Sequence, residues 1–132
     1  MKFTTILVTF LSLLLFTACQ KEETNCRDGV IGTYSSPSTA NYPAMEFILK
    51  AGGEDKEVVI TWTAQVSSTP QSYVLEGELN SNCSILKIID QPVGPSATYN
   101  GTLTFDDDKL VGTMVPNDPN INLTIPVNFT KE

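Results

Sequence analysis

The chain has 132 residues, three cysteines, no histidine and a formal net charge of −7. Its length fits one domain with a short leader, and 41% hydrophobic with 17% charged residues is typical of a globular protein. The acidic balance argues against a nucleic-acid partner, because no basic face is present to neutralise phosphates. The missing histidine excludes Ser-His-Asp and Cys-His catalysis and histidine-ligated metals, so we predict a protein without enzymatic activity, metal or cofactor.

Residues 1–18 have the pattern of a secretory signal peptide. Lys2 supplies the positive start, and residues 6–16 form an apolar run that is too short to span a bilayer. The segment Phe16-Thr17-Ala18-Cys19 resembles the bacterial lipobox. That resemblance implies that Cys19 is lipidated, becomes the new N-terminus and anchors the protein through acyl chains. An ordinary signal peptide with a chance cysteine is the alternative.

A short polar segment follows the cysteine. It consists of Gln20, Lys21, Glu22 and Glu23. The segment resembles the export signal of Bacteroidota surface lipoproteins, which implies an outer-membrane location with exposure on the cell surface. The alternative is a polar tether that carries no export signal. We expect three parts, namely a signal peptide at 1–18, a lipidated tether at 19–28 and a β-barrel domain at 29–132.

Cys26 and Cys83 form an even pair once Cys19 is acylated. In an exported protein such a pair suggests a disulfide. In the chain-entropy model, closing so long a loop contributes about 4 kcal/mol to the free energy of unfolding. Two buried free thiols are the alternative, and two cysteines without histidine make a poor zinc site.

Alternating apolar and polar residues dominate from Gly29 onward, while helical periodicity is scarce. Eight short strands are expected around residues 30–34, 45–49, 58–66, 73–79, 86–88, 99–105, 110–114 and 121–129. Sequential hairpins at this spacing favour an all-β, up-and-down antiparallel eight-stranded barrel, and a two-sheet β-sandwich is the alternative. Pro126 cannot donate to a ladder, so imperfect closure is expected at the last strand.

Four glycines fall at apparently inward strand positions, where we expect them to leave room inside the barrel. They are Gly32, Gly77, Gly101 and Gly112. Three tyrosines, Tyr34, Tyr73 and Tyr99, are expected to line one mouth of this barrel, with Trp62 in the same ligand-binding set. The alternative is that these tyrosines plug a packed barrel.

The up-and-down topology sorts the connections into two ends. The tether, Cys26 and Cys83 share one end, whereas seven of the eight prolines fall in the connections of the other. Those distal connections are residues 35–43, 67–71, 90–96 and 115–120. Proline lowers the entropy of a free loop, so these loops are expected to be partly pre-organised for contact. Tyr42, Asn117 and Asp118 are the residues expected to bind a partner.

Residues 29–131 resemble a lipocalin-like domain of the kind found in small Bacteroidota lipoproteins. Gly32-Thr33-Tyr34 is similar to the Gly-x-Trp start of lipocalins, with Tyr34 in place of tryptophan, and we predict no basic residue in the last strand to cap its ring. The resemblance implies binding of a small apolar ligand rather than catalysis.

The function expected first is therefore a surface-anchored barrel that binds a small hydrophobic or sugar ligand. The alternative is a protein–protein interaction module (an adhesin, accessory subunit or inhibitor) that acts through the proline-rich distal loops. A hydrolase that uses Glu76 and Glu78 is a third, weaker hypothesis, since nothing places them at a shared cleft. The run 106–109 lacks the ligand spacing of a calcium loop and predicts a solvated turn.

Overall fold

The computed structural model describes residues 25–95 and 97–132. The predicted lipidation residue Cys19 and export signal Gln20 to Glu23 lie outside the described residues. No helix of the described part is long and apolar enough to cross a membrane. The elements in chain order are α2 (Cys26–Val30), β1 (Gly32–Ser36), β2 (Met45–Ala51), β3 (Glu57–Val66), β4 (Thr69–Leu79), β5 (Ile85–Pro92), β6 (Thr98–Asp106), β7 (Lys109–Pro116) and β8 (Ile125–Lys131).

The eight strands form a closed antiparallel barrel in sequence order. Each strand pairs with the next, and β1 closes the barrel against β8 through Tyr34↔Lys131 and Ser35↔Thr130. This confirms the predicted up-and-down barrel, which is consistent with a lipocalin-like architecture. The alternative of two separate sheets is not adopted, because ladders join the strands at both seams.

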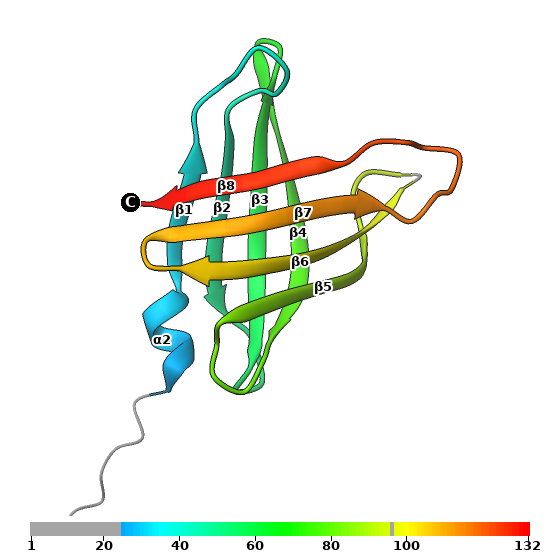
Figure 1. Cartoon of the computed structure of the whole chain (residues 1–132). Coiled ribbons are helices and arrows are strands. Elements are labelled where there is room, and N and C mark those ends of the chain that lie inside the picture. The colour runs from blue at the N-terminus through cyan, green and yellow to red at the C-terminus, as the bar shows by residue number, and fades with distance from the viewer. Residues whose placement is uncertain (1–24, 96) are drawn as a thin grey trace, which may run out of the picture.

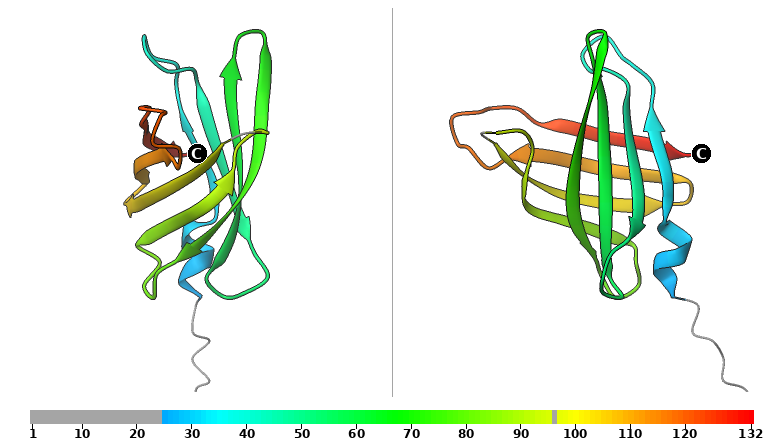
Figure 2. Two further views of the ribbon diagram at one scale, coloured as in Figure 1. Left: turned by 90° about the vertical axis from the view of Figure 1, so that its right-hand side faces the viewer. Right: turned by 180° about the vertical axis from the view of Figure 1, so that it is seen from behind.

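The barrel is flattened, with β1 to β4 crossing β5 to β8 at a steep angle (Figure 1). The view from behind in Figure 2 shows the same crossing. Pairing is long within each half, with ten residue pairs between β3 and β4. At the two seams it is short: β4 and β5 pair only through Glu78↔Lys87 and Leu79↔Leu86. Closure is thus weakest at β1–β8 and at β4–β5.

Alternation of burial along each strand follows the alternation in the sequence. In β3, Val58, Ile60, Trp62 and Ala64 are buried, while the residues between them are partly exposed. Apolar side chains fill the inside because this removes their surface from water. The same pattern runs through the other strands, so the local signal that predicts strands also gives their orientation.

The last strand is shorter than expected, because β8 begins at Ile125 rather than at 121. A turn precedes it, in which the Asp118 carboxylate accepts a hydrogen bond from the Asn120 backbone and the Asp118 carbonyl accepts one from Ile121. This turn competes with strand pairing and leaves Ile121 and Leu123 outside the sheet. Pro126 lies opposite Thr113 and is accommodated within β8.

The short helix α2 is a feature that the sequence did not predict. The Asn25 side chain caps it by accepting a hydrogen bond from the Arg27 backbone. The disulfide between Cys26 and Cys83 ties the helix to the β4–β5 connection and confirms the predicted bridge. The chain therefore enters the barrel at the end that holds the β2–β3, β4–β5 and β6–β7 turns, and the proline-rich loops lie away from it (Figure 1).

Candidate functional site

The interior of the barrel is filled by side chains. Val58, Ile60, Leu75 and Leu103 have no exposed surface at all, so no water-sized void touches them. The best-defined hollows of the described part have volumes of about 650, 400 and 450 Å³, and Tyr34, Trp62, Tyr73 and Tyr99 line none of these three. A filled interior supports the packed alternative for the tyrosines.

The inward glycines do not leave room for a ligand, contrary to expectation. A methyl group built on Gly77 would meet the Leu86 side chain at 2.7 Å, and one on Gly101 would collide with Met114. At Gly112 it would collide with the Thr102 carbonyl oxygen. The space that glycine frees is therefore occupied by neighbouring side chains and backbone, and these glycines permit close packing instead of a cavity.

Tyr34 does not line the distal mouth, which corrects the expectation for this residue. Its hydroxyl donates to the Val30 carbonyl oxygen at 2.9 Å, and its ring lies 5.9 Å from that of Phe105. Because β1 continues to Ser36, Tyr34 is not the end of the strand, and its side chain packs at the tethered end. Burial, together with the Asp108 carboxylate, raises the pKa of Tyr34 to about 12.

Lys131 caps the Tyr34 ring, so the prediction that no basic residue does this is wrong. Its Nζ atom lies 5.7 Å from the ring centroid and donates to the Gly29 carbonyl oxygen at 2.8 Å. Gly32 has a φ of +145°, and a methyl group there would lie 3.0 Å from the Lys131 side chain. Glycine is thus required where the lysine passes over β1, and together they seal the β1–β8 seam.

The other predicted aromatic residues do gather in one place. The Trp62 ring lies 6.0 Å from Tyr73 and 6.1 Å from Tyr99, and Phe47 packs edge-on against it. Tyr73 is half-buried and its hydroxyl donates to the Gln71 side chain. The Trp62 indole N–H is buried and has no hydrogen-bond partner among the described residues. These residues form a packed aromatic cluster below the distal loops.

The distal loops hold one another in place. The Tyr42 hydroxyl donates to the Thr124 carbonyl oxygen, which joins the β1–β2 loop to the β7–β8 loop. Asn117 accepts from the Asn100 side chain and donates to the Asp90 carboxylate. The Asp118 carboxylate accepts from the Asn120 backbone and side chain in the β7–β8 loop. All three predicted partner-binding residues, Tyr42, Asn117 and Asp118, therefore fix loop conformation through their side chains.

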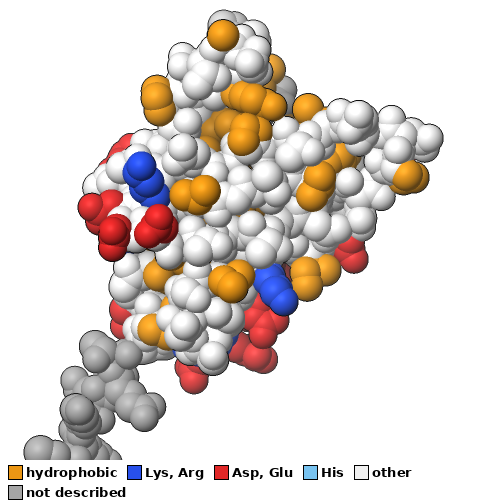
Figure 3. Space-filling view, viewed as in Figure 1, with side chains coloured by type: hydrophobic (Ala, Val, Ile, Leu, Met, Phe, Trp, Pro, Cys, Tyr) orange, Lys and Arg blue, Asp and Glu red, His pale blue; other side chains and the backbone are white. Residues whose placement is uncertain are grey.

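Apolar side chains are exposed in the β7–β8 loop, a signal that the sequence reading missed by assigning them to a strand. Ile121 is 41% and Leu123 is 43% exposed. Asp118 and Asn117 line a neighbouring hollow with Pro92, Gly94, Pro95, Ala97 and Thr98. Figure 3 shows apolar side chains gathered over the distal projections of the molecule. The distal end thus combines fixed loops, a hollow and exposed apolar groups.

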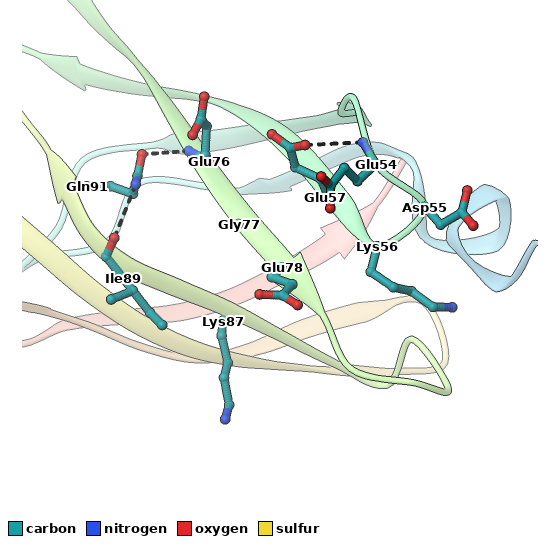
Figure 4. A pocket seen from close by; sticks show the side chains of 10 residues that line it. All are labelled: Glu54, Asp55, Lys56, Glu57, Glu76, Gly77, Glu78, Lys87, Ile89 and Gln91. Carbon is teal, nitrogen blue, oxygen red and sulfur yellow. Dashed lines mark hydrogen bonds between the residues drawn. The ribbon is translucent and has the colours of Figure 1, made fainter.

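Glu76 and Glu78 lie on the outer face of β4, where they line the groove shown in Figure 4 together with the β2–β3 turn. Glu54, Asp55 and Glu57 come from that turn and the start of β3, and Lys87, Ile89 and Gln91 come from β5. Asp107 adopts a positive φ of 49° in the hairpin turn between β6 and β7. Among residues 25–95 and 97–132, no group of three acidic, cysteine or histidine side chains is arranged to hold a metal ion.

Comparison with known proteins gave no relative: no family model, no curated protein and no solved structure matches this chain.

Proposed function

We propose that this protein is a surface-anchored interaction module that binds a protein partner through its distal loops. The observation that carries the proposal is the filled interior, which leaves binding to the outer surface, where the distal loops are fixed and expose apolar side chains. Anchoring through a lipid on Cys19 holds the opposite end, because the chain enters beside the Cys26–Cys83 disulfide. The distal loops then face away from the membrane.

The loops have the properties of a binding surface. Prolines and the Tyr42–Thr124 hydrogen bond restrict their conformations before contact, which reduces the entropy lost on binding. Ile121 and Leu123 provide apolar area that a partner would remove from water. The surrounding asparagines and Asp118 supply the polar rim that such interfaces use for orientation.

The test is capture of envelope or host-surface proteins by the immobilised full chain. The double variant Ile121→Ser/Leu123→Ser should lose the captured partner and keep its melting temperature, because both side chains are exposed. Val111→Ser is the matched control, since Val111 is 38% exposed on β7, outside the loop. Retained capture by the double variant, or equal loss in the control, would contradict the proposal.

A second candidate function, binding of a small ligand at the aromatic cluster, is favoured by the unpartnered Trp62 indole N–H. A buried donor without an acceptor costs free energy, and a ligand oxygen would satisfy it. Titration with sugars and fatty acids, followed by Trp62 fluorescence, tests this. A saturable change in Trp62 fluorescence favours the ligand, and an unchanged spectrum opposes it. Because Trp62 is the only tryptophan, the Trp62→Phe variant is tested by calorimetry instead, where loss of the donor should weaken binding and Tyr99→Phe should leave it intact.

A further inference from the structure

The edge of β4 that faces β5 is largely unpaired. The Leu79 N–H donates to the Lys56 carbonyl oxygen, so odd-numbered residues of β4 pair toward β3. The even-numbered residues Ser72, Val74 and Glu76 therefore point their N–H and C=O groups toward β5. Their ladder is absent, because the β4–β5 pairing in the described part stops at Glu78↔Lys87.

A bulge in β5 causes this separation. The register shifts between Ile88 and Gln91, and Asp90 has a φ of 48° with its N–H bonded to the Asn100 side chain. The bulge bends β5 away from β4, and the two strands leave their hairpin in different directions (Figure 1). A groove of about 650 Å³ lies at the start of this separation, lined by residues 76–78 of β4, by Lys87, Ile89 and Gln91 of β5 and by the β2–β3 turn. The unpaired residues Ser72 and Val74 continue β4 beyond its lining.

A side chain stands in for the missing strand at one position. The Glu76 N–H donates to Gln91 Oε1 at 2.8 Å, and Gln91 Nε2 donates back to the Ile89 carbonyl oxygen at 3.1 Å (Figure 4). Pro70 lies further along the same edge, where its lack of an N–H removes one donor. The edge N–H groups left available for pairing are those of Ser72 and Val74.

The outer face beside this edge is acidic. Glu57 lies directly opposite Glu78 in the β3–β4 register, and Lys87 lies opposite Glu78 on its other side. The groove is lined by five carboxylates and two lysines, so acidic side chains are in excess. Glu76 is the next outward residue on β4, and Glu54 and Asp55 close the end of the groove. Ile89, 63% exposed, lines the groove, and Val74, 65% exposed, precedes Glu76 on the outward face of β4.

We propose that an extended basic peptide segment of a partner protein adds to the free edge of β4 as a further strand, with one end of the peptide lying in the acidic groove. Its backbone would pair with Ser72 and Val74, and its outward lysines or arginines would lie beside Glu76 and Glu78. Apolar residues at the alternate positions would face half-buried Tyr73. The acidic row disfavours a second copy of this chain, because two such edges would bring carboxylates together.

This site is separate from the distal-loop surface, so its test is independent of the proposed function. The probe is the fluorescently labelled peptide acetyl-Lys-Val-Lys-Val-Lys-Val-Lys-amide, titrated with the purified full chain at low salt. We expect a saturable increase in the fluorescence polarisation of the peptide, and slower hydrogen exchange of the Ser72 and Val74 backbone amides. A matched peptide N-methylated at alternate residues keeps its charge but cannot pair as a strand, and it should bind at least about tenfold more weakly.

Two sets of variants complete the test. The double variant Glu76→Gln/Glu78→Gln should weaken peptide binding about tenfold and make the affinity less dependent on salt concentration. Glu46→Gln on β2 should change neither the affinity nor its salt dependence. Val74→Pro removes an edge N–H and should abolish binding. Equal binding of the N-methylated peptide would overturn the proposal, as would no effect of the double glutamine variant. Self-association of the chain through β4 in sedimentation would also overturn it.

Discussion

The ammonium group of Lys131 lies 5.7 Å from the centroid of the Tyr34 ring and donates to the carbonyl oxygen of Gly29. One side chain from the end of β8 thereby contacts both β1 and the helix α2. This contact lies at the β1–β8 seam, which only two residue pairs close. We therefore expect Lys131 to contribute more to the free energy of unfolding than a typical surface lysine.

Replacing Lys131 with methionine should lower the free energy of unfolding by about 1–2 kcal/mol, because a cation–π contact and a charged hydrogen bond are both lost. Urea denaturation measures the change. Lys109→Met is the control, since Lys109 is exposed on the adjacent β7. An equal effect of both substitutions would show that charge alone, and not the contact with Tyr34, matters.

The stability conferred by Tyr34 should fall at high pH. Its pKa is raised from 10.0 to about 12 in the folded protein, so above pH 10 the unfolded chain loses this proton first. Folding is then progressively disfavoured as the pH rises toward 12. The difference in unfolding free energy between the wild type and Tyr34→Phe should be constant below pH 10 and shrink above it. A pH-independent difference would contradict the raised pKa.

Loss of the disulfide should be costly. Cys26→Ala/Cys83→Ala should lower the free energy of unfolding by about 4 kcal/mol, because the bridge closes a loop with a sequence separation of 57 residues. Urea midpoints measured with and without a reducing agent check this. The reductant should shift the wild type and leave the double variant unchanged; a wild type insensitive to reduction would oppose a stabilising role.

Gly112→Ala should destabilise the barrel by about 1–3 kcal/mol, since the added methyl group meets backbone atoms of Thr102 and Leu103 that cannot move independently. Gly29→Ala is the matched control, because nothing lies within 4 Å of a methyl group there and alanine favours the helix. Thermal unfolding of both variants gives the comparison. Equal melting temperatures would indicate a looser interior than the packing implies.

The predicted anchor can be tested on intact cells. Cys19→Ala should move the protein from the membrane to the soluble fraction, because the thiol that would carry the lipid is removed. External protease should degrade the wild type, whereas Lys21→Ala/Glu22→Ala/Glu23→Ala should be protected by retention inside the cell. Equal cleavage of the wild type and the triple variant would exclude the export signal.

The sequence by itself predicted the eight-stranded up-and-down topology and the disulfide, and the structure excluded the alternatives of a two-sheet sandwich and two free thiols. Alternation is a local property, so strands such as residues 58–66 are recognisable without any tertiary information. Short hairpin connections then limit the strand order, and an up-and-down order brings Cys26 and Cys83 to the same end. The same reasoning predicts that Tyr73 and Tyr99 lie at one end of the barrel, and in the structure both rings lie near that of Trp62.

Only the tertiary structure decided where Tyr34 lies, whether the barrel is hollow and where its ladder is open. Tyr34 is in register with Phe47 and Trp62, yet it packs at the tethered end. Because the strands of a barrel are tilted, residues in register on successive strands lie at successively different heights along the barrel axis. Filling of the glycine positions depends on Leu86 and Met114 from neighbouring strands. The groove beside β4 depends on a bulge in β5. Each of these features is set by contacts between strands, which residue order along one strand does not encode.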